Sequence, residues 1–204
     1  MKKINKLILT GILLSATLVT YGCSGQTADK SQTSQTSTAQ AITSTKTETK
    51  EETANKLPTF ESVDIDGNKI SSDIFKQKDY TLINFWGTYC PPCIQEMPEL
   101  GKISDDYEDK NLQVVGIVID TLSQNGYDKD QIAKAKKIIK KTGAQYTHIQ
   151  LDTSMSELLT QLDLNAVPRT LLVDKELNIL EDIEGSRDLK FFEKMIEDAQ
   201  SKAE

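Results

Sequence analysis

Residues 83–100 read "INFWGTYCPPCIQEMPEL" and carry the pattern that decides the fold. An apolar, β-rich run ends at Gly87, and a helix is expected to begin at Pro91, because proline is tolerated in a first helical turn, where its missing N–H has no partner anyway. Two cysteines, Cys90 and Cys93, stand at this junction with only two prolines between them. Such a pair can be a redox centre, part of a metal site or a structural staple.

The residues around the pair favour redox chemistry over the other two. A closed zinc site takes about four nitrogen or sulfur ligands, and the domain adds one histidine, His148. A disulfide staple stabilises more when it closes a longer loop, and this loop is minimal. Cys90 lies where a helix begins, and the unpaired N–H groups and the positive dipole end there favour a thiolate. We therefore expect Cys90 to be the exposed attacking sulfur and Cys93, one turn later, the shielded resolving thiol.

Strands and helices alternate along the rest of the domain. Alternating apolar residues with a turn at residues 66–68 predict an amino-terminal hairpin. Buried-strand patterns cover residues 80–87, 112–120, 147–151, 169–174 and 178–185, and helical patterns cover residues 91–108, 128–143, 154–163 and 188–199. This order predicts an α/β fold with a mixed central sheet flanked by helices on both faces and with the β-hairpin added at the amino end. The lysines of the 128–143 helix are interpreted as a solvated face.

The amino end has the features of an export leader. Residues 1–22 open with three lysines and continue through an apolar stretch too short for a spanning helix, which predicts a signal peptide. The stretch ends in "LVTYGC", which resembles the lipobox of bacterial lipoproteins, although Thr20 and Tyr21 depart from its commonest form. The resemblance implies that Cys23 is lipidated and becomes the first residue of the mature protein. The alternatives are an ordinary secreted cysteine or an uncleaved anchor.

Composition divides the remainder into a tether and one domain. Residues 23–56 are rich in Ser, Thr and Gln with almost no large aliphatic residues, which predicts a disordered tether, and residues 57–204 form the domain. The formal net charge is −7, and loss of the three leader lysines lowers it by three, to −10. Such an acidic chain argues against nucleic acid as a partner, because one helix face is the only basic surface left to neutralise phosphates. With Cys23 lipidated, the other two of the three cysteines form one pair facing an oxidising exterior, and we expect an extracytoplasmic, membrane-anchored monomer.

Residues 83–100, together with "NAVPRTLLVD" at residues 165–174, resemble the thioredoxin superfamily, specifically the membrane-anchored TlpA/ResA-type thiol-disulfide oxidoreductases. The resemblance covers about residues 57–204. It implies a thioredoxin-like fold and a redox-active Cys90–Cys93 disulfide with no other cofactor or metal. It also implies a cis peptide between Val167 and Pro168, beside the disulfide, whose backbone pairs with an incoming substrate strand.

The chain departs from ordinary thioredoxins at one buried position. The resemblance implies an aspartate six residues before Cys90 that helps to deprotonate the inner thiol, and this chain has Asn84 there. Glu96, one helical turn after Cys93, matches a glutamate of the ResA type. A partly buried carboxylate at Glu96 would have a raised pKa and would shuttle the proton of Cys93. The alternative is a solvated surface glutamate.

Three further residues are candidates for contacting a substrate. Trp86 and Tyr89 frame the cysteine motif, and both are expected to pack around it and to touch the partner. Arg169 stands where relatives more often carry a small hydroxyl residue, so it either adds positive potential beside Cys90 or contacts an acidic partner, unless it points to solvent. His148 lies far from the motif in sequence and is interpreted as structural.

The motif also favours one direction of electron flow. The two prolines add neither charge nor N–H donor between the cysteines, and Glu96 would oppose a thiolate, so we expect a reductase of disulfides or oxidised thiols in exported proteins. The resemblance implies supply of electrons to cytochrome c maturation or methionine sulfoxide reduction, with a membrane donor of the CcdA/DsbD kind. The rival functions are a thiol oxidase of the same fold and a Sco-like copper-binding chaperone. A peroxiredoxin is disfavoured, because Thr88 lies two rather than three residues before Cys90.

Overall fold

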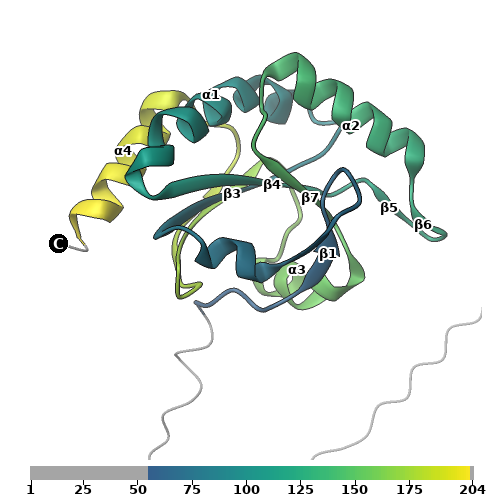
Figure 1. Ribbon diagram of the computed structural model, residues 1–204, viewed down its shortest axis with the longest axis horizontal. Helices are drawn as coiled ribbons and strands as arrows, with labels where there is room; N and C mark the ends of the chain where they lie inside the picture. The colour runs from purple at the N-terminus through teal and green to yellow at the C-terminus, as the bar shows by residue number, and fades with distance from the viewer. Residues whose placement is uncertain (1–54, 203–204) are drawn as a thin grey trace, which may run out of the picture. The chain divides into compact units, whose positions relative to one another are not determined.

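The computed structural model describes residues 55–202, which form an α/β domain around one mixed sheet (Figure 1). The sheet has five strands in the spatial order β7-β4-β3-β8-β9. Their bounds are Thr147–Gln150 for β7, Leu112–Val118 for β4, Tyr80–Trp86 for β3, Arg169–Asp174 for β8 and Ile179–Glu184 for β9. Strand β3 pairs in parallel with β4 and antiparallel with β8. The predicted mixed sheet is therefore confirmed, with the strand that carries the cysteine motif at its centre.

Helices cover both faces of this sheet, as predicted. The four helices are α1 at Pro91–Tyr107, α2 at Lys129–Thr142, α3 at Ser156–Leu162 and α4 at Leu189–Ser201. Helices α1, α2 and α4 lie along one face, and α3 lies on the other with the amino-terminal hairpin (Figure 1). None of the helices in residues 55–202 is long and apolar enough to cross a membrane. The predicted leader, tether and lipidated Cys23 lie outside the described residues.

The predicted amino-terminal hairpin is present. Strands β1, Glu61–Val63, and β2, Lys69–Ser71, pair antiparallel, and the Asp64 carboxylate closes their turn by accepting from the backbone N–H groups of Asp66 and Asn68. The backbone N–H of Ile65 donates to His148 O at 2.8 Å. The hairpin therefore covers the edge strand β7 of the main sheet, which leaves less unpaired backbone there.

The sequence patterns missed several short elements. Strands β5, Leu122–Ser123, and β6, Gly126–Tyr127, form a two-stranded ribbon between β4 and α2. Two short 3-10 helices, η1 at Ser72–Lys76 and η2 at Glu108–Lys110, were also missed, and a third, η3 at Thr153–Met155, forms the start of the helix predicted over residues 154–163. Elements this short have too few residues to show a hydrophobic period.

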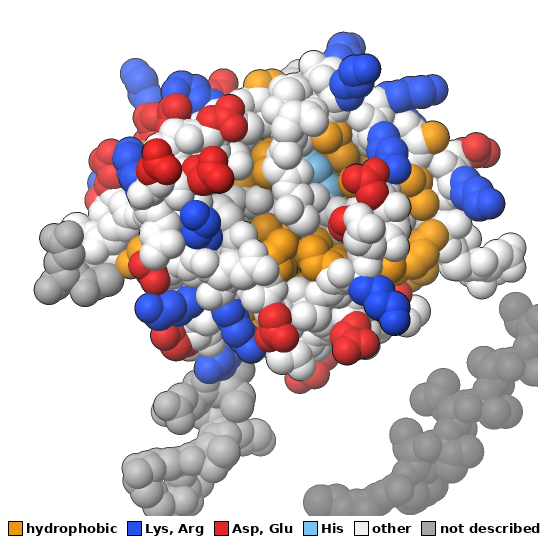
Figure 2. Space-filling view, in the orientation of Figure 1, with side chains coloured by type: hydrophobic (Ala, Val, Ile, Leu, Met, Phe, Trp, Pro, Cys, Tyr) orange, Lys and Arg blue, Asp and Glu red, His pale blue; other side chains and the backbone are white. Residues whose placement is uncertain are grey.

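The exposed lysines of α2 point outward along one edge of the molecule (Figure 2). One of them, Lys136, pairs with Asp66 of the hairpin turn at 2.7 Å. Both partners are exposed, so this ion pair is worth little. The arrangement fits the solvated face expected from the sequence.

The chain enters the described domain far from the cysteine motif. Leu57 N donates to Leu177 O and Ile179 N donates to Asn55 O, both at 2.8 Å, so residues 55–57 lie beside the turn between β8 and β9. The other end of β8 starts at Arg169, which pairs with Phe85 near the end of β3. Six residues of strand at about 3.3 Å each separate the two ends by roughly 20 Å.

Candidate active site

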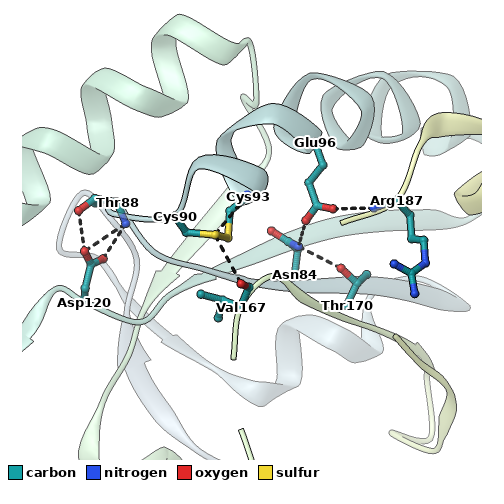
Figure 3. Close-up of a disulfide and its surroundings, with 9 residues drawn as sticks. All are labelled: Asn84, Thr88, Cys90, Cys93, Glu96, Asp120, Val167, Thr170 and Arg187. Carbon is teal, nitrogen blue, oxygen red and sulfur yellow. Dashed lines mark hydrogen bonds between the residues drawn. A yellow bond between two sulfur atoms is a disulfide. The ribbon is translucent and has the colours of Figure 1, made fainter. Parts of the chain in front are cut away.

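A disulfide joins Cys90 and Cys93 where β3 gives way to α1 (Figure 3). The Cα atoms are 5.3 Å apart. Cys90 is the residue that caps α1, and Cys93 lies in its first turn. The predicted pair of sulfurs at a helix start is therefore what the chain forms.

The start of α1 directs an N–H group at one of these sulfurs. Pro91 and Pro92 have no N–H, so the first free donor of the helix is the backbone N–H of Cys93. It donates to Cys90 Sγ at 3.2 Å. The first turn of α1 contains no acidic residue. After reduction, this N–H and the positive end of the helix both favour a thiolate on Cys90 rather than on Cys93.

The exposure of Cys90 differs from the prediction. Cys90 was expected to be exposed, and it is 4 % exposed, against 0 % for Cys93. Cys90 Sγ lies 3.6 Å from the carbonyl oxygen of Val167, so the loop before Pro168 covers it. The order of accessibility is still the expected one, but an attack on a partner has to occur beside this loop.

The loop beside the disulfide contains the cis peptide bond that the resemblance implies, between Val167 and Pro168. The carbonyl of Pro168 accepts from Gly185 N at 2.9 Å, which ties the loop to the end of β9. No hydrogen bond within residues 55–202 uses the backbone N–H of Val167. The loop therefore offers one free backbone donor next to Cys90.

Glu96 is a buried carboxyl one turn along α1 from the disulfide. Its side chain accepts from Asn84 Nδ2 at 2.9 Å and from the backbone N–H of Arg187 at 3.1 Å (Figure 3). The residue is only 2 % exposed, so burial raises the pKa of the carboxyl, although both hydrogen bonds act in the opposite direction. Glu96 is thus not the solvated surface glutamate that was the alternative.

Asn84 connects this carboxyl to the central sheet. Its amide nitrogen donates both to Glu96 and to Thr170 Oγ1, the latter at 3.0 Å. Asn84 and Thr170 are paired neighbours on β3 and β8, which explains their contact. Sequence reasoning noted Asn84 and missed Thr170 and Arg187, because pairing register and loop position decide their contacts. The strand predicted over residues 169–174 placed Thr170 in the sheet but did not place it beside Asn84.

Trp86 is part of the core rather than of the surface. It is fully buried, and its indole Nε1 donates to His148 Nδ1 at 3.2 Å. A Cβ at Gly116 of β4 would lie 2.3 Å from the same ring nitrogen, so only glycine leaves room for this contact. Trp86 packs in one cluster with Cys90 and Cys93, as expected, but packing between β3, β4 and β7 encloses the ring, so its position does not support the predicted contact with a partner.

His148 has a structural position, as interpreted from the sequence. Its Nε2 lies 3.0 Å from the carbonyl oxygen of Ala144, and its Nδ1 accepts from Trp86. Burial lowers the pKa of the imidazole to about 4, so the ring is neutral at pH 7. Both nitrogens are engaged, so His148 does not supply the third ligand that a Sco-like copper site needs. Among residues 55–202, no three His, Cys, Asp or Glu side chains are grouped to hold a metal.

Tyr89 and Arg169 lie at the rim of the site in different states. Tyr89 is 62 % exposed, and its ring folds over Gly87, where an added Cβ would lie 2.7 Å from a ring carbon. Arg169 is held by two bonds of 2.7 Å to the carboxylate of Asp182, and its Nη1 is 3.2 Å from Glu184. Tyr89 is free to meet a partner, whereas the charge of Arg169 is already balanced by two acids on β9.

The chain is similar to known redox proteins over most of its length. The family model described as Redoxin matches residues 52–198. Thiol-disulfide oxidoreductase ResA of Bacillus thuringiensis is 27% identical over 140 residues, which are 69% of this chain and 74% of that protein. The solved thioredoxin domain of a thiol-disulfide oxidoreductase from Bacteroides vulgatus is 26% identical with a TM-score of 0.57, over 69% of this chain and 95% of that one. The solved structure of a thioredoxin-like protein from Neisseria meningitidis is 28% identical with a TM-score of 0.57, over 72% of this chain and 91% of that one.

Proposed function

The chain belongs to the Redoxin family, as a ResA-type thiol-disulfide oxidoreductase of the thioredoxin superfamily, and on this premise we propose that it reduces disulfides or oxidised thiols in exported proteins. The observation that carries the proposal is the Cys93 N–H directed at Cys90 Sγ, which makes Cys90 the nucleophile. The resident redox group is the cysteine pair itself, and it cycles between dithiol and disulfide.

The reaction passes through a mixed disulfide. The Cys90 thiolate attacks one sulfur of the partner disulfide and releases the other as a thiolate. The Cys93 thiol then loses its proton and attacks Cys90 Sγ, which re-forms the Cys90–Cys93 bond and releases the second partner sulfur. Two electrons pass from the dithiol to the partner, and the partner leaves as a dithiol.

We propose that Glu96 accepts the proton that the Cys93 thiol loses in the second step. The carboxyl is one turn along the same helix and is buried, and burial raises its pKa, which makes its carboxylate a better proton acceptor than that of an exposed glutamate. Glu96 also borders an open surface hollow of about 570 Å³ with Arg187 and Phe191. The proton can therefore pass to solvent while a partner covers Cys90.

The charges and N–H donors around the two cysteines favour one direction of electron flow. Neither proline of the motif supplies an N–H or a charge to stabilise a thiolate further, and the Glu96 carboxylate, once ionised, opposes one. A less stabilised thiolate makes the dithiol a stronger reductant. This balance favours a reductase over a thiol oxidase of the same fold.

The docking surface consists of the cis-proline loop and the exposed Tyr89. The free N–H of Val167 can pair with an extended partner segment while the partner sulfur approaches Cys90. A membrane donor of the CcdA/DsbD kind reduces the Cys90–Cys93 disulfide again after each cycle. The proteins that receive the electrons include components of cytochrome c maturation or methionine sulfoxide reduction. The domain acts as a monomer, and nucleic acid has no part in its function.

The location follows from the amino end. Residues 1–22 act as a lipoprotein signal peptide, Cys23 carries the lipid, and residues 23–56 tether the domain of residues 57–204 outside the cell membrane. Labelling with radioactive palmitate in a bacterial host tests this part. Label on the wild-type chain and none on Cys23→Ser is expected, and equal label on both would refute lipidation.

Two measurements test the function. The reduction potential is expected to lie near that of thioredoxin, about −270 mV, with rapid reduction of insulin disulfides by the reduced protein. A value near −120 mV, typical of strong oxidants, would reverse the proposed direction. A Cys93→Ala variant is expected to retain exported proteins as mixed disulfides through Cys90, and a Cys90→Ala, Cys93→Ala double variant is the matched control.

A further inference from the structure

A second carboxylate lies beside the disulfide, on the side opposite Glu96 (Figure 3). Asp120 follows the end of β4, and its side chain meets the loop of residues 87–90, which links β3 to α1 and ends in Cys90. The sequence patterns treated Asp120 as the end of a strand and gave it no role. The mechanism above does not use it.

The carboxylate binds one residue of this loop three times. Asp120 Oδ1 and Oδ2 each accept from the backbone N–H of Thr88 at 3.1 Å, and Oδ2 also accepts from Thr88 Oγ1 at 2.5 Å. Thr88 is 4 % exposed, and Gln131 of α2 lies 3.1 Å from the same hydroxyl. The loop is further closed by Cys90 N, which donates to Gly87 O at 3.1 Å. Thr88 is therefore fixed from both β4 and α2.

The position of Cys90 depends on this contact. One residue separates Thr88 from Cys90, so their Cα atoms are within about 7 Å of each other. Movement of Thr88 would move Cys90 Sγ relative to the Cys93 N–H and the Val167 carbonyl. A negative charge bonded to the residue two positions before Cys90 also acts on any charge that forms on the sulfur.

Other charged groups near the loop are committed elsewhere. Glu96 bonds to Asn84 and Arg187, and Asp128 caps α2 by accepting from Asp130 N and Gln131 N. Arg169 is balanced by two acids on β9. Within residues 55–202, Asp120 is thus the charged side chain that bonds directly to the loop carrying Cys90.

We propose that Asp120 is a positioning residue for Cys90: through Thr88 it fixes the loop, and its negative charge makes the Cys90 thiolate less favourable than a neutral side chain would. The consequence is a more strongly reducing cysteine pair, so this inference rests on the proposed function and deepens it. In the structure Asp120 bonds to Thr88 and to neither sulfur, so it acts through the loop.

The test is Asp120→Asn in the full chain. Asparagine keeps a side-chain oxygen for Thr88 and removes the charge. Two quantities are measured: the pH dependence of Cys90 alkylation by iodoacetamide in the reduced protein, and the equilibrium constant of the cysteine pair against glutathione. We expect Cys90 to alkylate at least about threefold faster at pH 7, and the equilibrium to shift at least about threefold towards the dithiol, which corresponds to roughly 14 mV at about 30 mV per tenfold.

The controls separate charge, position and folding. Asp105→Asn removes the same charge from an exposed site on α1, 12 residues or about 18 Å beyond Cys93, and it should leave both quantities unchanged. Thr88→Ser keeps both donors and should resemble the wild type. Thr88→Val keeps the charge and loses the hydroxyl, so it should slow insulin reduction with a smaller change in potential.

Each outcome decides the inference. Unchanged alkylation and potential in Asp120→Asn would overturn it, as would shifts of equal size in Asp105→Asn or a shift towards the disulfide. An oxidising potential in the wild type would refute the proposed function and still leave the Asp120→Asn difference to be measured. A reducing wild type with no such difference would refute only the role of Asp120.

Discussion

The two faces of strand β3 are built for different purposes. Ile83 and Phe85 point into a hydrophobic cluster that also contains Phe75, Ile117 and Leu171. The intervening residues Asn84 and Trp86 point to the opposite face, where they meet a buried carboxyl, a hydroxyl and an imidazole. One strand thus separates a hydrophobic core from a second face that combines apolar packing with a buried polar network near the disulfide.

The difference shows what the redox site costs the fold. Apolar side chains on the first face stabilise the domain by leaving water. On the second face the Asn84 Oδ1 atom is buried with no hydrogen-bond partner in the described part of the chain, and Glu96 is buried in spite of its tendency to ionise. Buried polar groups that are not fully paired are destabilising. The redox chemistry of the nearby disulfide explains why these polar groups are buried. Substitutions on the apolar face should therefore change mainly the stability, and substitutions on the other face mainly the activity.

The largest effect, on activity, is expected for Cys90→Ser, at the start of α1 beyond the end of β3. A hydroxyl cannot form the mixed disulfide, so insulin reduction should fall by at least about a thousandfold. The unfolding midpoint of the reduced chain in urea should stay close to that of the reduced wild type, because one atom changes at the surface of the core. Substantial remaining turnover would show that Cys93 can start the exchange by itself.

The second largest effect is expected on the apolar face, in Phe85→Ala. The ring is fully buried, so its removal should lower the free energy of unfolding by about 3–5 kcal/mol. The folded fraction should keep its reduction potential, since no polar contact is lost. Urea unfolding and glutathione equilibration measure the two properties, with Phe85→Leu as the milder control. A changed potential in folded Phe85→Ala would erase the proposed separation between the faces.

A smaller effect is expected for Glu96→Gln, and it should depend on pH. Loss of the proton acceptor should slow resolution of the mixed disulfide by about a hundredfold above the raised pKa of Glu96, and less below it, where the wild-type carboxyl is already protonated. Stopped-flow measurement of partner release from pH 5 to 9 gives the profile. A variant whose profile superimposes on that of the wild type would remove Glu96 from the mechanism.

The same variant should change how stability depends on pH. The folded pKa of Glu96 is raised above the unfolded value, so the folded wild type binds more protons between the two values. Its stability should therefore decrease as pH rises from the unfolded pKa through the folded pKa, and then level off. Glu96→Gln should lack this loss, and urea unfolding at a series of pH values measures the difference.

The smallest effect is expected at the rim, in Arg169→Ala. The guanidinium is paired with Asp182 and Glu184 rather than directed at a partner. Its loss should cost about 1 kcal/mol of unfolding free energy and leave the KM for a disulfide-containing peptide nearly unchanged. A KM raised fivefold or more would restore the substrate contact considered from the sequence.

Much of this architecture could be predicted from local patterns. The strand before Cys90, the helix after it and the hairpin around Gly67 follow from periodicity and turn residues, and all are present. Some boundaries differed: β4 was expected to reach Asp120 and ends at Val118, where Ile119 N makes the last backbone bond to β3, at Trp86 O, before the chain turns. β9 begins at Ile179 because Asn178 donates to the Asp174 carboxylate.

The contacts between distant residues could not be predicted in the same way. The pattern placed Glu96 one turn from Cys93, but its partners Asn84 and Arg187 are 12 and 91 residues away in the chain. Trp86 was expected to pack around the motif and to touch the partner, and the pairing of β3 with β4 directs its indole N–H to His148 instead. Asp120 was missed for the same reason, since only the parallel pairing of β3 with β4 brings it to Thr88.

The entry of the chain beside Leu177 has a practical consequence for handling the protein. A purification tag, a bead or a fused carrier placed before Asn55 would attach at the end of the sheet where β8 and β9 are joined, which is the end remote from the sulfurs. The last turn of α4 lies at the same end of the sheet, because Gln200 Nε2 donates to the Lys110 carbonyl just before β4 begins. Immobilisation through either end should leave the reactive sulfur open, so column-bound enzyme is expected to reduce protein disulfides nearly as fast as free enzyme.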